Sequence, residues 1–291
     1  MSTNKKLVTV CIPAYNHEKF VIETIQSIID QTYDDIELLI INDGSPDHTH
    51  DKIMELYDAC EKRFKAFKYI NRENRGLIST LNEFITLANG YYFTVIASDD
   101  FCSKTKIELQ VNALENNPEY AMCYGNMIGV DENSEITQKR TTKYNVSGEL
   151  FEKLLFRNFI TAPTVMLKKS VLDEVEGYDP KYKIEDHPMW LKIAKNYKIY
   201  YLDEDLVYYR DHPNNMSKNV SFMIEENEKM LNDYSGEAIY PSVIQRHNLY
   251  CFIQLVREKE KELAKKYMLK AFPASWYHPK FIKGLIRYLF I

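Results

Sequence analysis

The chain has 291 residues, of which 45% are hydrophobic and 27% are charged, a composition that excludes wholesale disorder. Its 37 Lys and Arg residues and 42 Asp and Glu residues give a net charge of -5, which argues against general nucleic-acid binding. We therefore expect no nucleic acid among its partners.

The five cysteines are widely spaced and include no CxxC pair, a pattern typical of reduced thiols rather than of a disulfide framework or a zinc site. The chain shows no signal-peptide pattern and no apolar run of the roughly 18 residues that a membrane-spanning helix needs. These features predict a cytoplasmic protein, or one on the cytoplasmic face of a membrane.

The N-terminal third alternates between apolar, strand-like runs and amphipathic helical segments. Strands are predicted at residues 7–12, 36–41, 67–70 and 91–97, and helices at residues 18–30, 49–64 and 77–88. Near-continuous apolar strands separated by helices indicate an α/β fold, with a mainly parallel central sheet that helices flank on both faces.

The remainder of the chain is less regular. Here we predict strands at 121–126, 164–168, 199–202 and 206–209, helices at 104–116, 148–156, 170–175 and 187–196, and a loop or hairpin at 131–144. From residue 223 onward the pattern is helical with charged faces. We place a boundary near Asn219, which gives an α/β domain at 1–219 and a helical, basic extension at 220–291.

Polar residues follow three of the predicted strands. Tyr15, Asp43 and Asp99 each come shortly after an apolar run. A parallel sheet binds its ligands outside the carboxyl ends of its strands. We therefore expect these three side chains, distant in sequence, to meet at one edge of the sheet.

Asp99 and the adjacent Asp100 are candidate metal ligands. The chain has neither a GxGxxG after its first strand nor a GxxxxGK[ST] loop, and it has only 9 glycines, so a glycine-rich phosphate loop is unsupported. A divalent cation held by carboxylates is the natural substitute, because Mg²⁺ and Mn²⁺ prefer oxygen ligands. Adjacent acids at a strand end also serve simply as a turn or a helix cap.

A second acidic pair, Glu185-Asp186, precedes a predicted helix that contains Trp190. The pair is suited either to capping that helix or to supplying a general base in a substrate cleft. His212 follows the last predicted strand and is suited either to a structural role or to metal ligation.

In their order along the chain these motifs resemble those of the family 2 glycosyltransferases, enzymes of the GT-A fold that use nucleotide sugars. The resemblance covers about residues 7–217. Its segments are VTVCIPAYN (8–16), IELLIINDGS (36–45), NRGL (74–77) with Asn82, SDD (98–100), ED (185–186) with Trp190, and YRDH (209–212). Each segment alone is modest, and their common order makes the resemblance specific.

The resemblance implies roles for individual residues. Asp186 would be the base that deprotonates the acceptor hydroxyl, in a single displacement that inverts the sugar configuration. Asp99 and His212 would hold Mn²⁺ or Mg²⁺, which neutralises charge on the departing UDP. The residues implied in nucleotide binding are Pro13, Tyr15, Asp43, Arg75 and Ser98. Those implied in contacts with the donor sugar or acceptor are Asp100, Glu185 and Trp190, where Asp100 would alternatively support the site and Glu185 would alternatively support Asp186.

Several of these implied roles are more specific. Tyr15 would pack on the uracil ring, and Asp43 would accept the hydrogen of the uracil imide. Arg75 and Arg210 would contact phosphate or would form surface ion pairs. The chain departs from the family at Ala97, where an acid often precedes Asp99 by two positions, and this departure puts the strength of metal binding in doubt.

The C-terminal segment 263–291 has six Lys and Arg residues and no acidic residue, so it carries +6 while the rest of the chain carries -11. Basic residues interleaved with aromatic residues suit a helix that lies on a membrane surface. They suit equally a terminal helix that packs on the core or in a homo-oligomer.

The resemblance, together with the basic tail, implies an inverting enzyme that transfers a hexose from UDP-glucose, UDP-galactose or UDP-N-acetylglucosamine. The expected acceptor is a glycan linked to undecaprenyl diphosphate at the inner face of a bacterial cell membrane, as in O-antigen or capsule synthesis. A sugar-1-phosphate nucleotidyltransferase is disfavoured, because residues 13–16 do not form a glycine-rich, basic loop. The other alternative is a non-catalytic, membrane-associated protein that keeps the fold and binds a UDP-sugar or a glycan.

Overall fold

The computed structural model describes residues 5–140, 144–213 and 215–290. The chain forms two compact units. The N-terminal unit comprises Met1–Phe151 and Phe159–His212, and the C-terminal unit comprises Glu152–Asn158 and Pro213–Ile291. The domain boundary near Asn219 stays a prediction.

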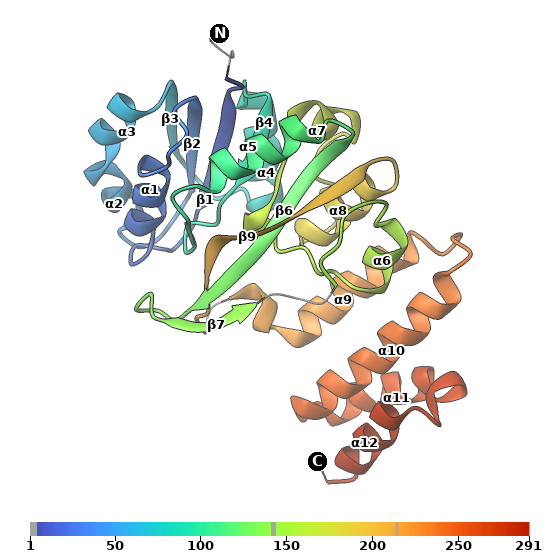
Figure 1. Cartoon of the computed structure of the whole chain (residues 1–291). Coiled ribbons are helices and arrows are strands. Elements are labelled where there is room, and N and C mark those ends of the chain that lie inside the picture. Colours follow the sequence, from blue (N-terminus) through green and yellow to red (C-terminus); the bar gives the residue numbers. More distant parts are fainter. Residues whose placement is uncertain (1–4, 141–143, 214, 291) are drawn as a thin grey trace. The chain divides into compact units, whose positions relative to one another are not determined.

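A nine-stranded sheet, counted over the described residues, forms the centre of the N-terminal unit (Figure 1). The strand order is β3-β2-β1-β4-β8-β6-β9-β5, and β7 pairs with β6. The strands are β1 (Val8–Ala14), β2 (Ile36–Asp43), β3 (Ala66–Arg72), β4 (Tyr92–Val95), β5 (Phe101–Cys102), β6 (Tyr120–Val130), β7 (Ile136–Arg140), β8 (Met166–Lys168) and β9 (Lys198–Arg210).

The parallel arrangement predicted for the N-terminal third is confirmed, because β3, β2, β1 and β4 all run in one direction. Every residue of β2 is buried, and β1 is buried except at the half-buried Pro13, as expected for strands covered on both faces. Because these strands are parallel, β1, β2 and β4 end at the same edge of the sheet, after Ala14, Asp43 and Val95.

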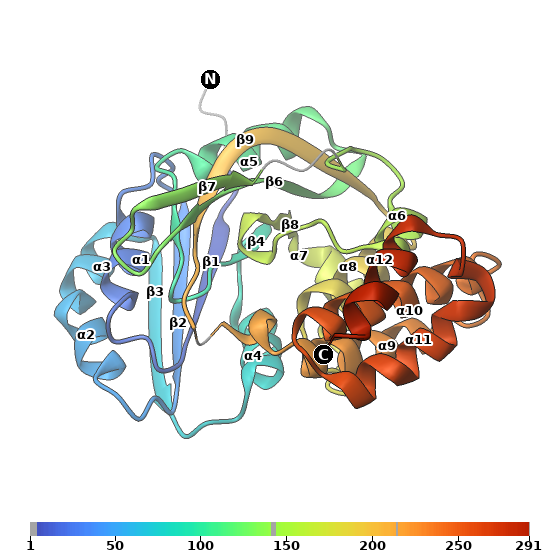
Figure 2. The ribbon, with the colours of Figure 1, turned by 90° about the horizontal axis from the view of Figure 1, so that it is seen from below.

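Helices cover both faces of this part of the sheet. Val21 and Ile25 of α1 pack into a core with Val10 of β1 and Leu38 of β2. Figures 1 and 2 show α1, α2 and α3 together on one side, whereas α4 contacts β1 and β2 from the other side. The helices of this unit are α1 (Val21–Ile29), α2 (Thr49–Glu55), α3 (Tyr57–Arg63), α4 (Leu77–Leu87), α5 (Lys106–Asn116), α7 (Lys169–Glu174) and α8 (Asp186–Ala194), with a 3-10 turn at Ala162–Thr164.

The other half of the sheet is mixed. Strand β8 runs antiparallel to both β4 and β6, and β9 runs parallel to β6. Strand β9 is continuous over 13 residues, so the prediction of two strands at 199–202 and 206–209 is wrong. The acidic residues Asp203 and Glu204 resemble a turn in sequence, but they occupy exposed strand positions. The extra residues form an irregularity in β9, where Tyr201 pairs with Tyr124 and Asp205 with Asn126, so the two strands stay paired on either side of it. The hairpin predicted within 131–144 is confirmed by β7, and residues 141–143 lie outside the described part.

The C-terminal unit is helical, as predicted from residue 220 onward, and has a core of its own. Phe252 and Leu255 of α10 are fully buried together with Tyr267 of α11 and Phe281 of α12. None of the described helices is long and apolar enough to cross a membrane. The helices are α6 (Phe151–Phe156), α9 (Val220–Asn232), α10 (Tyr240–Arg257), α11 (Lys261–Ser275) and α12 (Pro279–Tyr288), with a 3-10 turn at Met216–Lys218.

Candidate active site

The turn after β4 carries both Asp99 and Asp100. Residues Ala97 to Asp100 form a β-turn, in which the Asp100 N–H donates to the Ala97 carbonyl at 3.1 Å. The buried Thr24 hydroxyl of α1 lies 2.7 Å from the Asp100 carbonyl and 2.9 Å from the Ser98 carbonyl. Helix α1 therefore fixes the backbone of the turn.

Arg210, at the end of β9, supports the same turn. Its backbone N–H donates to the Asp100 carboxylate at 2.8 Å, and its Nε donates to the Asp99 carbonyl at 2.8 Å. The remaining guanidinium nitrogens bind the Asp131 carbonyl and form an ion pair with Glu23. Arg210 is only 1% exposed, so the predictions that it contacts phosphate or forms a surface ion pair are both wrong. It is a buried structural support whose donors are already used.

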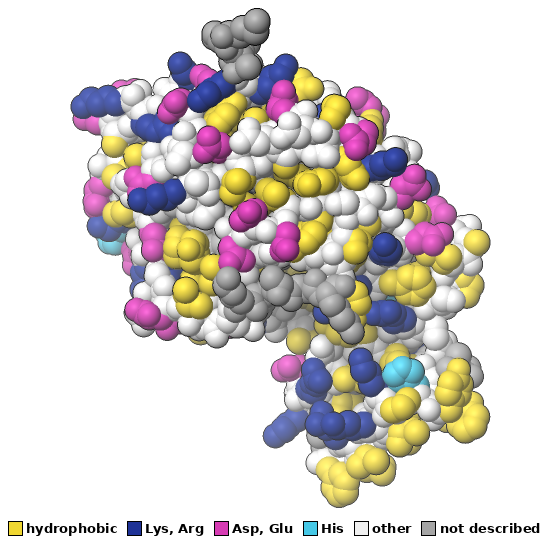
Figure 3. All heavy atoms as spheres, viewed as in Figure 1, with side chains coloured by type: hydrophobic (Ala, Val, Ile, Leu, Met, Phe, Trp, Pro, Cys, Tyr) yellow, Lys and Arg dark blue, Asp and Glu magenta, His cyan; other side chains and the backbone are white. Residues whose placement is uncertain are grey.

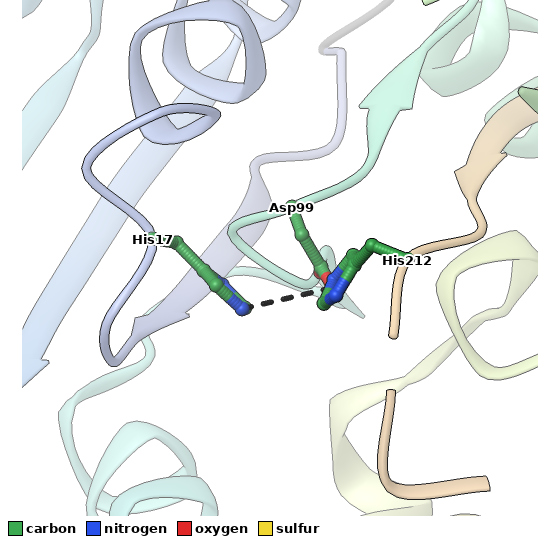
Figure 4. A group of neighbouring side chains, drawn as sticks. All are labelled: His17, Asp99 and His212. Atoms are coloured by element: carbon green, nitrogen blue, oxygen red, sulfur yellow. Dashed lines mark hydrogen bonds and ion pairs between the residues drawn. The ribbon is translucent and has the colours of Figure 1, made fainter. Parts of the chain in front are cut away.

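His17, Asp99 and His212 meet at the carboxyl edge of the sheet (Figure 4). They come from the loop after β1, the turn after β4 and the segment after β9. The His212 Nε2 lies 2.9 Å from the Asp99 Oδ2, and the His17 Nε2 lies 3.8 Å from the same oxygen. One donor atom of each residue lies within 4.8 Å of the other two, a spacing that suits a single metal ion.

Neighbouring groups fix the orientation of both rings. The His17 Nδ1 shares a 2.8 Å hydrogen bond with the Ser98 hydroxyl, which leaves Nε2 facing the carboxylate. The Phe20 ring stacks on His212 with the ring centroids 5.5 Å apart. Asn16 has a φ of 57°, a left-handed conformation that asparagine tolerates, and this turns the chain after β1 immediately before His17.

Burial and mutual contacts set the charges at this site. Burial alone would raise the pKa of Asp99, but the hydrogen bond from His212 and the nearby His17 ring hold that pKa below its ordinary value. Burial lowers the pKa of His17, although Asp99 opposes the shift. Burial and the Asp99 charge raise the pKa of Asp100 well above its ordinary value. The cluster therefore offers one carboxylate and two imidazoles as donors.

Asp43, at the end of β2, binds the loop that precedes α4. Its carboxylate forms a 2.9 Å ion pair with Arg72 and accepts hydrogen bonds from the N–H groups of Arg75, at 3.0 Å, and Gly76, at 2.8 Å. Gly44 allows the two loops to approach this closely, because a Cβ there would lie 2.5 Å from a backbone nitrogen of the facing loop. The carboxylate is thus held rigidly at the sheet edge.

The other residues implied in nucleotide binding differ in exposure. Tyr15 is 50% exposed, so much of its ring is accessible, and Pro13 is half-buried just before it. The Arg75 side chain is 62% exposed. Ser98 is 1% exposed, and its hydroxyl is bonded to His17. Their contacts with a nucleotide stay predictions.

The second acidic pair begins α8. Glu185 is the N-cap residue, and Asp186 is the first helical residue, whose carboxylate accepts from the His187 N–H at 2.6 Å. Burial, together with the Asp186 charge, raises the pKa of Glu185 to about 7. The positive end of the helix dipole favours a negative charge at the same place. The pair is therefore suited to holding a single proton near neutral pH.

Asn82 of α4 holds the loop that leads to this pair. Its Nδ2 donates to the Tyr178 carbonyl at 2.8 Å, and its Oδ1 accepts from the Tyr178 N–H at 2.8 Å. Burial raises the pKa of the Tyr178 hydroxyl, and the charges of Glu185, Cys11 and Asp186 raise it further. The charges of the acidic pair therefore act on the Tyr178 hydroxyl in the same buried surroundings.

Two residues implied in sugar contacts are deeply buried. Asp100 is 2% exposed, and its bond to the Arg210 N–H favours the supporting role that was one reading of the sequence. Trp190 is 3% exposed, and its indole N–H has no hydrogen-bond partner among the described residues. Contacts of either side chain with a sugar stay predictions.

His17 and Arg72 are site residues that no sequence motif predicted. His17 follows Tyr15 by two positions, so the rule that ligands bind beyond strand ends also applied to it. Arg72 is the last residue of β3 and pairs in register with Asp43, a relation that needs the strand alignment and is not visible in the sequence.

Comparison with known proteins agrees with this geometry. The model of glycosyl transferase family 2 matches residues 9–176. An uncharacterised glycosyltransferase of Methanocaldococcus jannaschii is 29% identical over 211 residues, which cover 71% of each chain. The Escherichia coli UDP-Glc:alpha-D-GlcNAc-diphosphoundecaprenol beta-1,3-glucosyltransferase WfgD is 30% identical over 193 residues, or 66% of this chain and 72% of that protein. A mannosyltransferase of Pyrobaculum calidifontis, solved with GDP-Man and Mn²⁺, has a TM-score of 0.65 at 13% identity over 99% of this chain and 86% of that one.

The sheet, its flanking helices and these matches define a hexosyltransferase of the GT-A fold. The chain belongs to glycosyl transferase family 2. The fold and the enzyme class expected from the sequence motifs are both confirmed.

Proposed function

We propose that the enzyme is an inverting, metal-dependent transferase that moves a hexose from a UDP-sugar to a hydroxyl of a lipid-linked oligosaccharide in bacterial surface-polysaccharide synthesis. The cluster of His17, Asp99 and His212 carries this proposal, because it lies at the sheet edge where such folds bind their ligands. The name of the related Escherichia coli enzyme, which states a UDP-Glc donor and a diphosphoundecaprenol acceptor, supports both substrate classes.

The three donor atoms of this cluster fit a divalent cation, and we propose His17, Asp99 and His212 as its ligands. Mg²⁺ prefers oxygen ligands alone, whereas imidazole nitrogen binds first-row transition metals well, so the donor set favours Mn²⁺ over Mg²⁺. The Mn²⁺ present in the mannosyltransferase structure supports this choice. When bound, the ion neutralises negative charge on the departing diphosphate. In this proposal His17 compensates for Ala97, which replaces the first acid of the family motif.

The nucleotide would bind along the ends of β1 and β2. The accessible ring of Tyr15 offers a surface on which uracil stacks, and the anchored carboxylate of Asp43 accepts the imide hydrogen. Arg72 fixes that carboxylate. The exposed guanidinium of Arg75 forms a 3.9 Å surface ion pair with Glu83, and in this proposal it exchanges that partner for phosphate. Ser98 acts through the ring of the neighbouring histidine rather than by its own contact with the ligand.

Asp186 is the proposed general base. It takes the proton of the acceptor hydroxyl as the hydroxyl oxygen bonds to the anomeric carbon, and the bond from that carbon to the UDP oxygen breaks with its electron pair leaving on UDP. Attack from the side opposite UDP converts an α-linked donor into a β-linked product. Glu185, with a pKa of about 7, supports this base by carrying the proton that the pair shares.

A lipid-linked acceptor remains in the bilayer, so we propose that the enzyme works at the inner face of the cell membrane. Its proposed partners there are the UDP-sugar and a glycan on undecaprenyl diphosphate. Family membership favours this enzyme over the non-catalytic alternative.

A UDP-release assay tests the proposal. The panel contains UDP-glucose, UDP-galactose, UDP-N-acetylglucosamine and GDP-mannose, each with Mn²⁺, Mg²⁺ or EDTA, and with or without a lipid-diphosphate-linked N-acetylglucosamine. We expect release from one UDP-sugar that needs a divalent ion, is faster with Mn²⁺ and rises with acceptor. The Asp99→Asn variant should lose the metal-dependent rate. Turnover of GDP-mannose alone, or full activity in EDTA, would refute the proposal.

A further inference from the structure

The last two helices of the C-terminal unit expose an unusual amount of apolar surface. Sixteen large hydrophobic side chains are exposed among the described residues, and nine of them lie between Leu269 and Phe290. The exposed fractions reach 71% for Leu289 and 84% for Phe290, and Trp276 is 60% exposed. Figure 3 shows hydrophobic side chains and Lys and Arg side chains together over these helices. Apolar surface gathered in this way marks an interaction site.

Helix α12 already has a packed face, and the exposed apolar residues lie on a second one. The centroids of the Phe281 ring and the Phe252 ring of α10 lie 5.3 Å apart. A Cβ at Gly284 would lie 2.8 Å from the nearest carbon of the same Phe252 ring. At about 100° per residue, Ile282, Leu285, Ile286 and Leu289 share a different arc of the helix. Packing within the C-terminal unit therefore does not account for that arc, because the face that packs on α10 is already in use.

A basic arc lies beside the apolar arc. Lys280, Lys283 and Arg287 are all exposed and share this arc, and none of the three forms an ion pair with a described residue. Lys270 of α11, in contrast, is paired with Glu228. Because residues 263–291 contain no acid, the positive charge of this surface is not neutralised from within its own segment.

We propose that this surface, made by the apolar and basic arcs of α12 with the exposed aromatic residues of α11, binds a bilayer that contains anionic lipids. The apolar arc would enter the headgroup and acyl boundary, and the basic arc would lie at the level of the phosphates. With 10 residues α12 is about 15 Å long, half the thickness of the hydrocarbon core of roughly 30 Å. It therefore lies in the plane of the interface.

Charge also favours a lipid surface over a second copy of the chain. A two-fold interface places the same patch on both partners, so it would bring the positive charges of Lys280, Lys283 and Arg287 from both copies into one interface. Like charges brought together in this way oppose association. Anionic headgroups supply the complementary charge, and Trp276 and Tyr277 are the amphipathic aromatic types that favour the membrane interface.

This inference deepens the proposed function, and its purpose, bringing the enzyme to a lipid-linked acceptor, rests on that function. The membrane binding itself does not depend on that function, because it can be measured without donor or acceptor. Failure of vesicle binding would leave the transferase proposal intact, and failure of sugar transfer would leave the membrane surface intact.

The test is flotation of the full chain with vesicles of phosphatidylcholine alone and with vesicles of equal parts phosphatidylcholine and phosphatidylglycerol. One variant carries Leu289→Glu and Phe290→Glu, and its control is Ile136→Glu, a 64% exposed apolar position in the N-terminal unit. The second variant replaces the basic arc, with Lys280→Gln, Lys283→Gln and Arg287→Gln. Its control carries the same change at three exposed lysines of the N-terminal unit, Lys62, Lys65 and Lys68.

We expect the wild type to bind the anionic vesicles and to be released by salt, because screening weakens charge attraction. The basic-arc variant should bind about a hundredfold more weakly, and the apolar variant should also lose binding, whereas both controls bind as the wild type does. Circular dichroism and UDP release with a water-soluble acceptor should be unchanged in all variants. Equal binding of variants and wild type would overturn the proposal. So would a wild-type dimer in solution that the apolar variant abolishes while vesicle binding is absent.

Discussion

Two pairs of adjacent acids, Asp99-Asp100 and Glu185-Asp186, are treated differently by the fold. In the first pair, contact with His212 holds the pKa of Asp99 below its ordinary value, so one carboxylate stays charged for a cation. In the second pair, burial and the neighbouring charge raise the pKa of Glu185 to about 7. Basic neighbours therefore make the pair Asp99-Asp100 a cation site, whereas burial without basic neighbours makes the pair Glu185-Asp186 a proton site.

A substitution in the proton site, the pair Glu185-Asp186, should have the strongest consequence for activity. Asp186→Asn removes the proposed base, and we expect the rate of sugar transfer to fall by about two to four orders of magnitude. Affinity for UDP and for Mn²⁺ should stay unchanged, because UDP is assigned to the ends of β1 and β2 and Mn²⁺ to His17, Asp99 and His212. A UDP-release assay measures the rate of sugar transfer, and calorimetry measures the affinities for UDP and Mn²⁺.

The matched control for this variant is Asp58→Asn, which removes the same charge from an exposed position on α3. It should transfer sugar at the wild-type rate. If Asp186→Asn kept a similar rate, the base would have to be sought elsewhere, with Glu185 as the next candidate.

The second effect concerns the scaffold of the cation site. Arg210→Met removes the ion pair with Glu23 and the hydrogen bond to the Asp99 carbonyl. We expect the free energy of unfolding to fall by roughly 2 to 4 kcal/mol, measured by urea denaturation. Arg257→Met, at an exposed position, should change it little. Equal stability of the two variants would show that the turn holds without this buried arginine.

The sequence predicted the cation site better than it predicted the supports around it. Asp99 and Tyr15 follow buried strands, so the period of the apolar residues and the strand-end rule place them without coordinates. Arg210 was misread because its burial depends on the turn after β4, which packs against it from 111 residues away in sequence. Charged residues are usually exposed, and a local pattern contains no sign that a guanidinium finds buried partners from distant segments.

The two halves of the sheet show the same limit. The parallel half was predicted because each strand is buried on both faces and reads as one apolar run. Strand β9 was divided in two because Asp203 and Glu204 resemble a turn, and only its pairing with β6 shows that the chain continues as a strand. The spacing of apolar residues within one strand does not show which distant strand it pairs with.

The third prediction concerns the affinity of the cation site for Mn²⁺. His17→Ala removes one of two imidazoles, and we expect the affinity for Mn²⁺ to fall by more than the roughly ten- to a hundredfold that loss of an outer-shell partner causes. Ser98→Ala should cause a smaller loss, because it frees the ring without removing it. His48→Ala, at an exposed histidine of the same unit, is the control. Calorimetric titration with Mn²⁺ measures all three, and an unchanged affinity in His17→Ala would exclude this residue as a ligand.

The last prediction concerns Glu185 and the free energy of unfolding, and its expected size is the smallest. The pKa of Glu185 is raised from 4.5 to about 7 in the folded chain, so the folded state binds more protons than the unfolded state between these values. Stability contributed by this group is therefore present at low pH and is lost as the pH rises through that window. Glu185→Gln should remove this loss and make the protein more stable than wild type by about 1 to 3 kcal/mol at roughly pH 8, and by much less near pH 5. Urea denaturation at both pH values measures the difference in free energy of unfolding between this variant and wild type, and Glu149→Gln is the exposed control. A difference that did not depend on pH would mean that Glu185 is charged in the folded state at both pH values.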